Sequence, residues 1–439
     1  GSEMCIRDST YIMNTDQNPY TSAGARYYAL GLLTVVYTFN FVDRQLLSIL
    51  QESIKADLLL SDQQLGLLTG FAFALFYTLA GIPIARYADR NNRRNVVAIA
   101  IALWSFMTAI SGLVQNYLQL LLARIGVGVG EAGGSPPAHS MISDIFPPER
   151  RASALAFYSM GINFGILFGF LAGGWLNEFF DWRVAFFVVG APGIVVALFV
   201  RYTLREPIRG LMEDRQDVAT DTPFPEVLKL LWSRLSFRHL AIGGALNAFA
   251  GYSSSNWTAS FMIRSHDMST GELGTWLALI MGVGGAIGVF WGSYIAERLA
   301  KFDVRWYMWM PTITGMICVP FMIATYVVEG AYTALIVSIV PGILFNVYLG
   351  NSLAMTHALV GLRMRAVASA ILFFLINLIG MGLGPWGVGL LSDILSAELG
   401  NESLRYAMLY LLPAAMGWSA VHFLLASRTL QKDLEAAPA

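Results

Sequence analysis

Charged side chains are scarce in this chain of 439 residues. Asp, Glu, Lys and Arg make up 13% of the sequence and hydrophobic residues 56%, whereas an ordinary soluble domain is about 25% charged. This composition excludes a typical soluble globular protein and indicates a polytopic membrane protein. The net charge of −1 carries no information about partners, but the basic residues lie at the edges of apolar runs, which argues against nucleic-acid binding.

The residues needed for catalysis or metal binding are also few. The two cysteines, Cys5 and Cys318, lie far apart, and the five histidines show no metal-ligand spacing. Gly128-x-Gly130-x-x-Gly133 matches a dinucleotide-binding pattern, but that pattern requires a preceding strand and a βαβ unit, and the sequence predicts neither. We therefore predict no enzyme activity, no metal and no organic cofactor.

Long apolar runs dominate what is present. The hydrocarbon core of a bilayer is about 30 Å thick and needs roughly 20 apolar residues in a helix. Twelve runs meet this requirement, at about 27–50, 64–85, 95–115, 117–142, 153–177, 184–204, 239–262, 273–296, 306–328, 331–358, 366–391 and 406–427. The expected fold class is an all-α polytopic membrane protein with twelve transmembrane helices in two pseudo-symmetric bundles of six.

The polar stretches between the runs predict the domain organisation. The first 25 residues are polar and lack the apolar core of a signal peptide, so we expect a disordered tail at 1–25. The longest polar stretch, 205–238, divides the spans six and six. The expected parts are therefore an N-terminal bundle at 26–204, a linker at 205–238, a C-terminal bundle at 239–428 and a short tail at 429–439.

The distribution of basic residues predicts the orientation. With the N-terminus inside, 22 of the 28 Lys and Arg residues lie in cytoplasmic segments, as the positive-inside rule requires. The outer segments hold Lys55, Arg183, Arg264 and Arg405. We expect both termini and the linker to be cytoplasmic.

The two halves resemble each other. Arg151-Ala-Ser-Ala opens the fifth span and Arg365-Ala-Val-Ala the eleventh, and an Asn follows twelve residues after each Arg, at Asn163 and Asn377. Halves repeated in the same orientation predict duplicated domains with a site between them. The fifth span also carries a glycine every four residues, which predicts a face for close helix packing.

Four charged side chains lie inside two of the spans: Asp43 and Arg44 in the first, Arg124 and Glu131 in the fourth. Each costs at least ~2.5–3.5 kcal/mol at the bilayer centre, so such residues are usually functional. Arg124 and Glu131 are seven residues apart, on one helix face and ~10.5 Å apart along the axis. The depths predict a pair between Asp43 and Arg124, with Arg44 reaching towards Glu131.

Two interpretations of these four residues remain open and are compatible with each other. In one, Asp43 and Glu131 exchange a proton, because low dielectric raises the pKa of a carboxyl group and a nearby arginine lowers it. In the other, Arg44 and Arg124 bind an anionic substrate. A purely structural ion network is the alternative, but buried pairs are poor stabilisers.

The loop after the second span carries a family resemblance. Gly81-Ile-Pro-Ile-Ala-Arg-Tyr-Ala-Asp89-Arg90-Asn-Asn-Arg93-Arg94 resembles the signature loop between helices 2 and 3 of the major facilitator superfamily, roughly G-x-x-x-D-R-x-G-R-R. Ala85 and Asn92 replace the usual glycines. The resemblance covers about residues 27–430 and implies that Asp89 contacts helix 11. It also implies a cytoplasmic gate formed by Asp89, Arg90, Arg93 and Arg94. Simple anchoring by positive charge is the alternative for this loop.

Three further segments are similar to the bacterial branch of the spinster family: Asn-Phe-Val-Asp43-Arg44-Gln, Gly-Val-Gly-Glu131-Ala and Ser143-Asp-Ile-Phe-Pro-Pro-Glu-Arg-Arg-Ala. This resemblance implies a proton-coupled transporter of an anionic amphiphile, such as a lysophospholipid or a sphingosine phosphate. The coupling ion would be the proton, the functional unit a monomer and the location a bacterial inner membrane. The family architecture implies that Asn247, Tyr252 and Asn346 line the opposite wall of the cavity.

Two other functions stay open at this point. One is a carrier of small organic anions, sugar phosphates or drugs. The other is a membrane lipid sensor that transports nothing.

Overall fold

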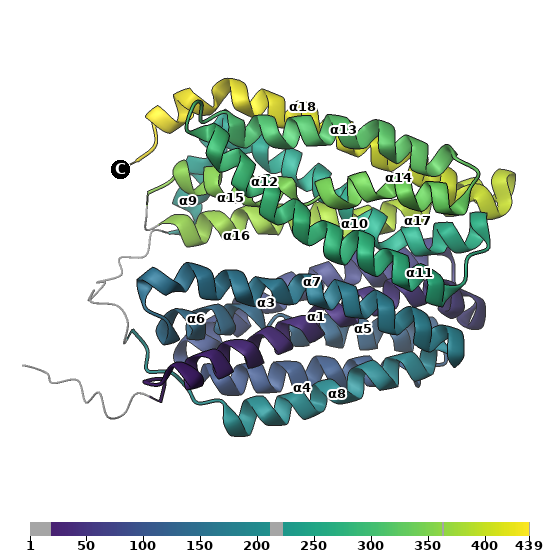
Figure 1. The fold of residues 1–439 in the computed structure, drawn as a ribbon, viewed down its shortest axis with the longest axis horizontal. Coiled ribbons are helices and arrows are strands. Elements are labelled where there is room, and N and C mark those ends of the chain that lie inside the picture. The colour runs from purple at the N-terminus through teal and green to yellow at the C-terminus, as the bar shows by residue number, and fades with distance from the viewer. Residues whose placement is uncertain (1–18, 211–222, 362–363, 439) are drawn as a thin grey trace, which may run out of the picture.

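The computed structural model describes residues 19–210, 223–361 and 364–438. In these ranges the regular secondary structure is helical throughout, and long helices lie side by side along the longest axis of the molecule (Figure 1). They form two bundles, the first from α1 to α8 and the second from α10 to α18.

Six membrane-length helical stretches build the first bundle. The second stretch is interrupted by a π-helical turn, η2, and the fourth by a short break at 132–134. The elements are α1 (Ala23–Leu58), α2 (Asp62–Gly66), η2 (Leu67–Phe71), α3 (Ala72–Arg90), α4 (Arg93–Ser111), α5 (Tyr117–Glu131), α6 (Ser135–Ile145), α7 (Pro148–Phe179) and α8 (Trp182–Thr203).

The second bundle repeats this pattern after a short helix, α9. Its interruptions are the π-helical turns η3 and η5 and a break at 345–346. The elements are α9 (Phe224–Ser233), α10 (Leu235–His266), α11 (Thr270–Leu277), η3 (Ala278–Val283), α12 (Gly284–Ala300), α13 (Trp306–Val327), α14 (Ala331–Leu344), α15 (Val347–Ala358), α16 (Arg365–Leu375), η5 (Ile376–Leu383), α17 (Gly384–Leu399), η6 (Gly400–Glu402) and α18 (Ser403–Glu435).

Eight helical stretches of the described part are long and apolar enough to cross a membrane. One of these, Arg365–Glu435, contains two membrane-length stretches, α16–η5–α17 and α18, which are joined at η6. The long stretches outside this set are α1, α5 with α6, and α10. The first two of them carry the four buried charges.

Three details differ from the expected boundaries. α1 begins at Ala23, inside the expected tail, of which residues 1–18 lie outside the described residues. The expected linker contains α9 and the first turn of α10, while its residues 211–222 also lie outside the description. α18 continues to Glu435, through most of the expected C-terminal tail.

Polar residues at the loops start many of these helices. Ser61 and Gln64 form a capping box at α2, and Asp181 caps α8. Asn92, which replaces a glycine of the superfamily loop, is the N-cap of α4 and accepts a hydrogen bond from the Asn95 amide at 3.0 Å. The departure from the loop pattern therefore has a structural use.

The glycines of the fifth span form a face for close helix packing, as the sequence predicted, and this face lies against α1. A Cβ on Gly165 would come within 2.6 Å of the Thr38 carbonyl oxygen, and one on Gly169 within 2.9 Å of the Val42 carbonyl oxygen. No larger side chain fits at these distances without moving a backbone. The glycine face thus sets the position of α1, which carries Asp43 and Arg44.

The start of α1 and the end of α18 lie at the same end of the molecule (Figure 1). We call this the termini end. The opposite end, where α1 ends at Leu58 and α10 at His266, is called the distal end.

Candidate functional site

The four charged residues lie together inside the first bundle. Asp43, Arg124 and Glu131 are 1%, 2% and 0% exposed, and the Arg44 side chain is 15% exposed. Arg44 is therefore the member of this quartet that reaches the surface between the bundles.

Arg44 and Glu131 form an ion pair, as the sequence predicted. Nε and Nη2 of Arg44 both lie 2.8 Å from Oε2 of Glu131, and Oε1 has no hydrogen-bond partner. Three aromatic rings surround the guanidinium, with centroids at 4.8 Å for Phe41, 4.9 Å for Phe73 and 5.2 Å for Tyr77. Hydrogen bonds and ring faces together compensate for the desolvation of this arginine.

The predicted ion pair between Asp43 and Arg124 is not formed in this structure, so that prediction is wrong. Neither oxygen of Asp43 has a hydrogen-bond partner, and neither do Nε and Nη1 of Arg124. Matching depth did not suffice, because adjacent residues of a helix point about 100° apart. With Arg44 directed at Glu131, Asp43 faces Thr108 of α4, and the Arg124 guanidinium lies over the ring of Phe73 at 5.4 Å.

The glycines of α5 bring two neighbouring helices onto the quartet. A Cβ on Gly128 would lie 3.2 Å from the Phe73 carbonyl oxygen, and one on Gly130 would lie 2.8 Å from the Trp104 backbone nitrogen. α3 and α4 therefore approach α5 more closely than larger residues permit. This packing accounts for the glycine pattern that resembles a dinucleotide motif.

The second bundle faces Arg44 with Tyr252 of α10. This side chain packs against apolar residues of both bundles and is close enough to Arg44 to act on it electrostatically. Two hydrogen bonds join α1 to α10 nearby, from Ser255 to Gln45 at 3.1 Å and from Ser48 to Asn256 at 3.0 Å.

The two predicted lining residues Asn346 and Asn247 lie elsewhere. Asn346 lies beside Gly285, and Asn163 of the first bundle is near the same position: a Cβ on Gly285 would be 3.1 Å from the Asn346 amide nitrogen and 3.8 Å from the Asn163 amide oxygen. Asn247 is 2% exposed and its amide contacts the Met416 sulfur at 3.7 Å, inside the second bundle. The structure therefore brings Tyr252 to the quartet, but not Asn247.

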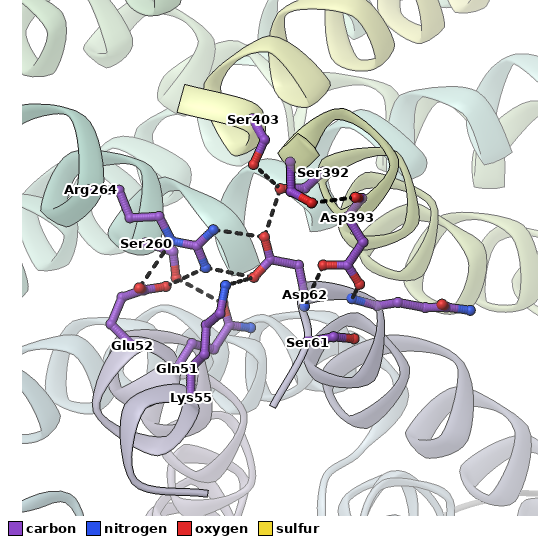
Figure 2. Close-up of polar contacts among 12 residues, drawn as sticks. Gln51, Glu52, Lys55, Ser61, Asp62, Ser260, Arg264, Ser392, Asp393 and Ser403 are labelled. Carbon is purple, nitrogen blue, oxygen red and sulfur yellow. Dashed lines mark hydrogen bonds and ion pairs between the residues drawn. The ribbon is translucent and has the colours of Figure 1, made fainter. Parts of the chain in front are cut away.

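A second charge cluster, which the sequence did not predict, joins the bundles at the distal end (Figure 2). Arg264 of α10 donates to Glu52 of α1 at 2.8 and 3.0 Å and to Asp62 of α2 at 2.6 and 2.7 Å. These are fork-like contacts from one guanidinium to two carboxylates, the geometry in which arginine binds most specifically.

Further contacts extend this cluster to α17. Ser392 donates to Asp62 at 2.6 Å, and Asp393 accepts from the Asp62 and Gln63 amides at the start of α2, at 3.0 and 2.8 Å. Lys55 adds an ion pair to Asp62 at 2.6 Å. We call these residues the distal clamp: Glu52, Lys55, Asp62, Arg264, Ser392 and Asp393.

The sequence did carry a signal for the distal clamp. Four basic residues lie in segments predicted to be outside, and each has an acidic partner. Lys55 and Arg264 bind Asp62, Arg183 pairs with Asp57, and Arg405 pairs with Glu402. In this protein, each basic residue predicted to lie outside, against the positive-inside rule, thus forms an ion pair.

Comparison with known proteins decides the family. A family model described as Major Facilitator Superfamily matches residues 33–385. This chain belongs to the major facilitator superfamily. The superfamily fold, with two bundles of six transmembrane helices, agrees with the predicted fold class. Its members are membrane transporters and not enzymes.

Individual relatives agree with this assignment. An MFS-type efflux pump of Mycolicibacterium smegmatis is 34% identical over 425 residues, covering 96% of this chain and 97% of that protein. Protein spinster homolog 1 of Xenopus tropicalis is 27% identical, covering 86% and 76%. A crystal structure of a bacterial homolog of the human lysosomal transporter Spinster, inward-facing and unoccupied, superposes with a TM-score of 0.82 at 32% identity, covering 94% and 99%.

The superfamily loop at the termini end divides into two parts. Arg93 is 1% exposed and donates to Glu206, Ser140, Asp144 and the Pro207 carbonyl oxygen, all within the first bundle and the segment that follows it. Its place is therefore structural in this conformation.

Among the described residues, the remaining loop residues make no hydrogen bond or ion pair across the bundles. Asp89 and Arg90 are exposed, and Arg94 donates to Asn95 and Leu204. Within the described ranges, no hydrogen bond or ion pair joins the Asp89 carboxylate to α16, the start of helix 11 of the superfamily. The implied gate contact is thus absent in this conformation, while the distal clamp is closed.

Proposed function

We propose that this protein is a proton-coupled secondary active transporter that moves an anionic amphiphile, such as a lysophospholipid or a sphingosine phosphate, by alternating access. The observation that carries the proposal is the quartet. Two acids and one arginine are buried in the first bundle, the partly exposed Arg44 faces the second bundle, and only one ion pair is formed among the four.

Asp43 and Glu131 are the proton carriers in this proposal. Asp43 has no hydrogen-bond partner, and one oxygen of Glu131 has none either. A buried carboxylate without partners costs far more free energy when ionised than when neutral. A change in the surroundings of either group therefore drives proton uptake or release.

Arg44 is the candidate for the substrate headgroup. When Glu131 takes up a proton, Arg44 no longer has a negatively charged partner. The Arg44 guanidinium still faces Tyr252 of the second bundle. A guanidinium binds carboxylate or phosphate through two parallel hydrogen bonds. The rings of Phe41, Tyr77 and Tyr252 offer apolar surface to the remainder of the substrate.

The two ends of the molecule serve as the two gates. The distal clamp holds α1 and α2 to α10 and α17, so it closes one end, and the loop with Asp89 and Arg90 closes the other in the alternate state. In this proposal the termini end faces the cytoplasm of a bacterial cell and the transporter acts as a monomer. The bodies that rock are the bundles at 26–204 and 239–428, joined by the linker 205–238.

Proton coupling is tested in proteoliposomes by the single variants Asp43→Asn and Glu131→Gln. An imposed proton gradient changes substrate flux through the parent protein, and we expect each variant to lose that response, because the substituted amide carries no exchangeable acid proton. If both variants respond like the parent, the coupling proposal is wrong.

Asp303→Asn is the matched control. Asp303 is a partly exposed loop carboxylate paired with Arg305, which lowers the pKa of Asp303. It stays ionised over the assay range, so we expect its removal to leave the response to the gradient unchanged.

A second candidate function is a proton-coupled carrier of small organic anions or drugs. It is favoured by the similarity to the MFS-type efflux pump, which extends over nearly the whole of both chains. Uptake of a lysophospholipid compared with a water-soluble phosphate ester separates the two candidates. Preference for the soluble ester would support the second candidate and contradict the first.

A further inference from the structure

The two arginines of the quartet share one aromatic ring. Phe73 of α3 is 1% exposed, and its ring centroid lies 4.9 Å from the Arg44 guanidinium carbon and 5.4 Å from that of Arg124. Phe41 and Tyr77 contact Arg44 alone. The Phe73 ring thus contacts both arginines of the quartet: Arg44, which is paired with Glu131, and Arg124, which forms no ion pair with any described residue.

For Arg124 this ring is a close contact that compensates for burial, while the charges of Glu131 and Asp43 act on Arg124 without direct contact. Two of its three guanidinium nitrogens, Nε and Nη1, have no hydrogen-bond partner, and no ion pair to Arg124 is formed among the residues that the structure describes. A desolvated guanidinium over a ring face is attracted by the negative charge of that face.

The ring is held in place by its surroundings. Gly128 leaves room for it, since a Cβ there would lie 3.4 Å from Cδ2 of Phe73. Tyr77, one turn further along α3, stacks on the ring with centroids 5.8 Å apart. The π-helical turn η2 ends two residues before Phe73, and such turns frequently lie at functional sites.

We propose that Phe73 is a positioning residue that assigns the two arginines to different roles. Its ring keeps Arg124 out of hydrogen-bond contact with both carboxyl groups, so that Arg44 alone pairs with Glu131 and Asp43 has no hydrogen-bonded counter-charge. This inference rests on the proposed function, in which Asp43 and Glu131 carry the coupling proton.

Without the ring, Arg124 is free to turn to Asp43 or Glu131. An arginine next to a carboxyl group favours the ionised form, so a stronger acid is required to protonate it. The other titratable groups that face the two carboxyl groups or Arg44 are the phenols of Tyr37, Tyr77 and Tyr252. A phenol is a far weaker acid than a carboxyl group. The pH dependence of transport therefore reports on the position of Arg124.

The test compares the pH at which transport is half-maximal in proteoliposomes. For Phe73→Leu we expect a shift of about one pH unit or more to lower pH. Phe73→Met, which conserves volume but has no ring face, should shift it equally, and Phe73→Tyr should restore the parental value. Phe186→Leu, the same change in the core of the first bundle, should keep the parental midpoint.

A double variant identifies the cause. If released Arg124 produces the shift, Phe73→Leu combined with Arg124→Gln should have the midpoint of Arg124→Gln alone. A proton-coupled parent whose Phe73→Leu and Phe73→Met variants both keep its midpoint would overturn this inference and leave the proposed function standing. A parent without any proton-driven flux would overturn both.

Discussion

Arg90 and Arg93 are three residues apart in one loop, yet their surroundings are opposite. Arg93 is buried and donates to two carboxylates, a hydroxyl group and a carbonyl oxygen, whereas Arg90 is exposed. The sequence predicted both for the same gate. The difference arises because the partners of Arg93 lie 47 to 114 residues away in the chain, where no local pattern reveals them.

This contrast gives a prediction on stability. We expect Arg93→Gln to destabilise the folded protein, because it leaves Asp144 and Glu206 without their counter-charge. Breaking such a pair costs about 3–5 kcal/mol when fully buried, and the two acids are 12% and 24% exposed, so the lower end applies. The measurement is the thermal unfolding midpoint in detergent.

Arg90→Gln serves as the control for this measurement, because it removes the same charge from the same loop at an exposed position. Equal midpoints for the two variants would show that Arg93 has no structural role of its own.

At the scale of single residues, the sequence placed all four members of the quartet and one of the two pairs. The depth of a residue along its helix can be read from its sequence position, and this predicted the pair between Arg44 and Glu131. The direction of a side chain around the helix depends on which neighbour each face meets. That is why Asp43 and Arg124 were paired wrongly, and why Phe73 was not recognised at all.

The helices are positioned by close contacts at glycines. α7 lies on α1 through a row of glycines, and α5 meets α3 and α4 through another. The four-residue period made the first row predictable. The π-helical turns η2, η3 and η5 were not predicted. An extra residue shifts the helical phase by about 100°, but the spans around these turns are apolar on most faces, so the shift is not visible in the sequence.

The glycine row gives a prediction for the elements. We expect Gly169→Ala to lower the thermal midpoint, because its methyl group would lie 2.8 Å from Gln45 Cβ and 2.9 Å from the Val42 carbonyl oxygen. Overpacking of this kind costs about 1–3 kcal/mol. In Gly417→Ala the nearest atom is at 3.7 Å, so that variant should match the parent. A midpoint for Gly169→Ala equal to that of Gly417→Ala would contradict the packing role.

Over the whole molecule, the bundles are joined at the distal end and along the adjoining half of α1. The contact between Gln51 and Ser260, at 3.2 Å, continues the Gln45 and Ser48 contacts towards the distal clamp. This closure agrees with the similarity to an inward-facing relative. The sequence predicted two bundles with a site between them, but a contact between bundles depends on the conformational state and was not predicted.

The distal clamp gives a prediction on conformation. We expect Asp62→Asn to open the distal end, because Arg264 and Lys55 then lose a shared carboxylate. A cysteine in place of Ser260, which is fully buried in the parent, should become reactive towards a membrane-impermeant thiol reagent. Asp57→Asn is the control, since Asp57 pairs with Arg183 inside the first bundle. Equal protection in both backgrounds would show that the distal clamp does not hold the end closed.

The central claim is that the quartet couples proton movement to substrate movement. The most direct measurement is net substrate flux in proteoliposomes of the parent protein, with equal substrate on both sides and a proton gradient imposed first in one direction and then in the other. The account predicts that reversing the gradient reverses the sign of the net flux. A flux that stays at zero under both gradients would contradict it.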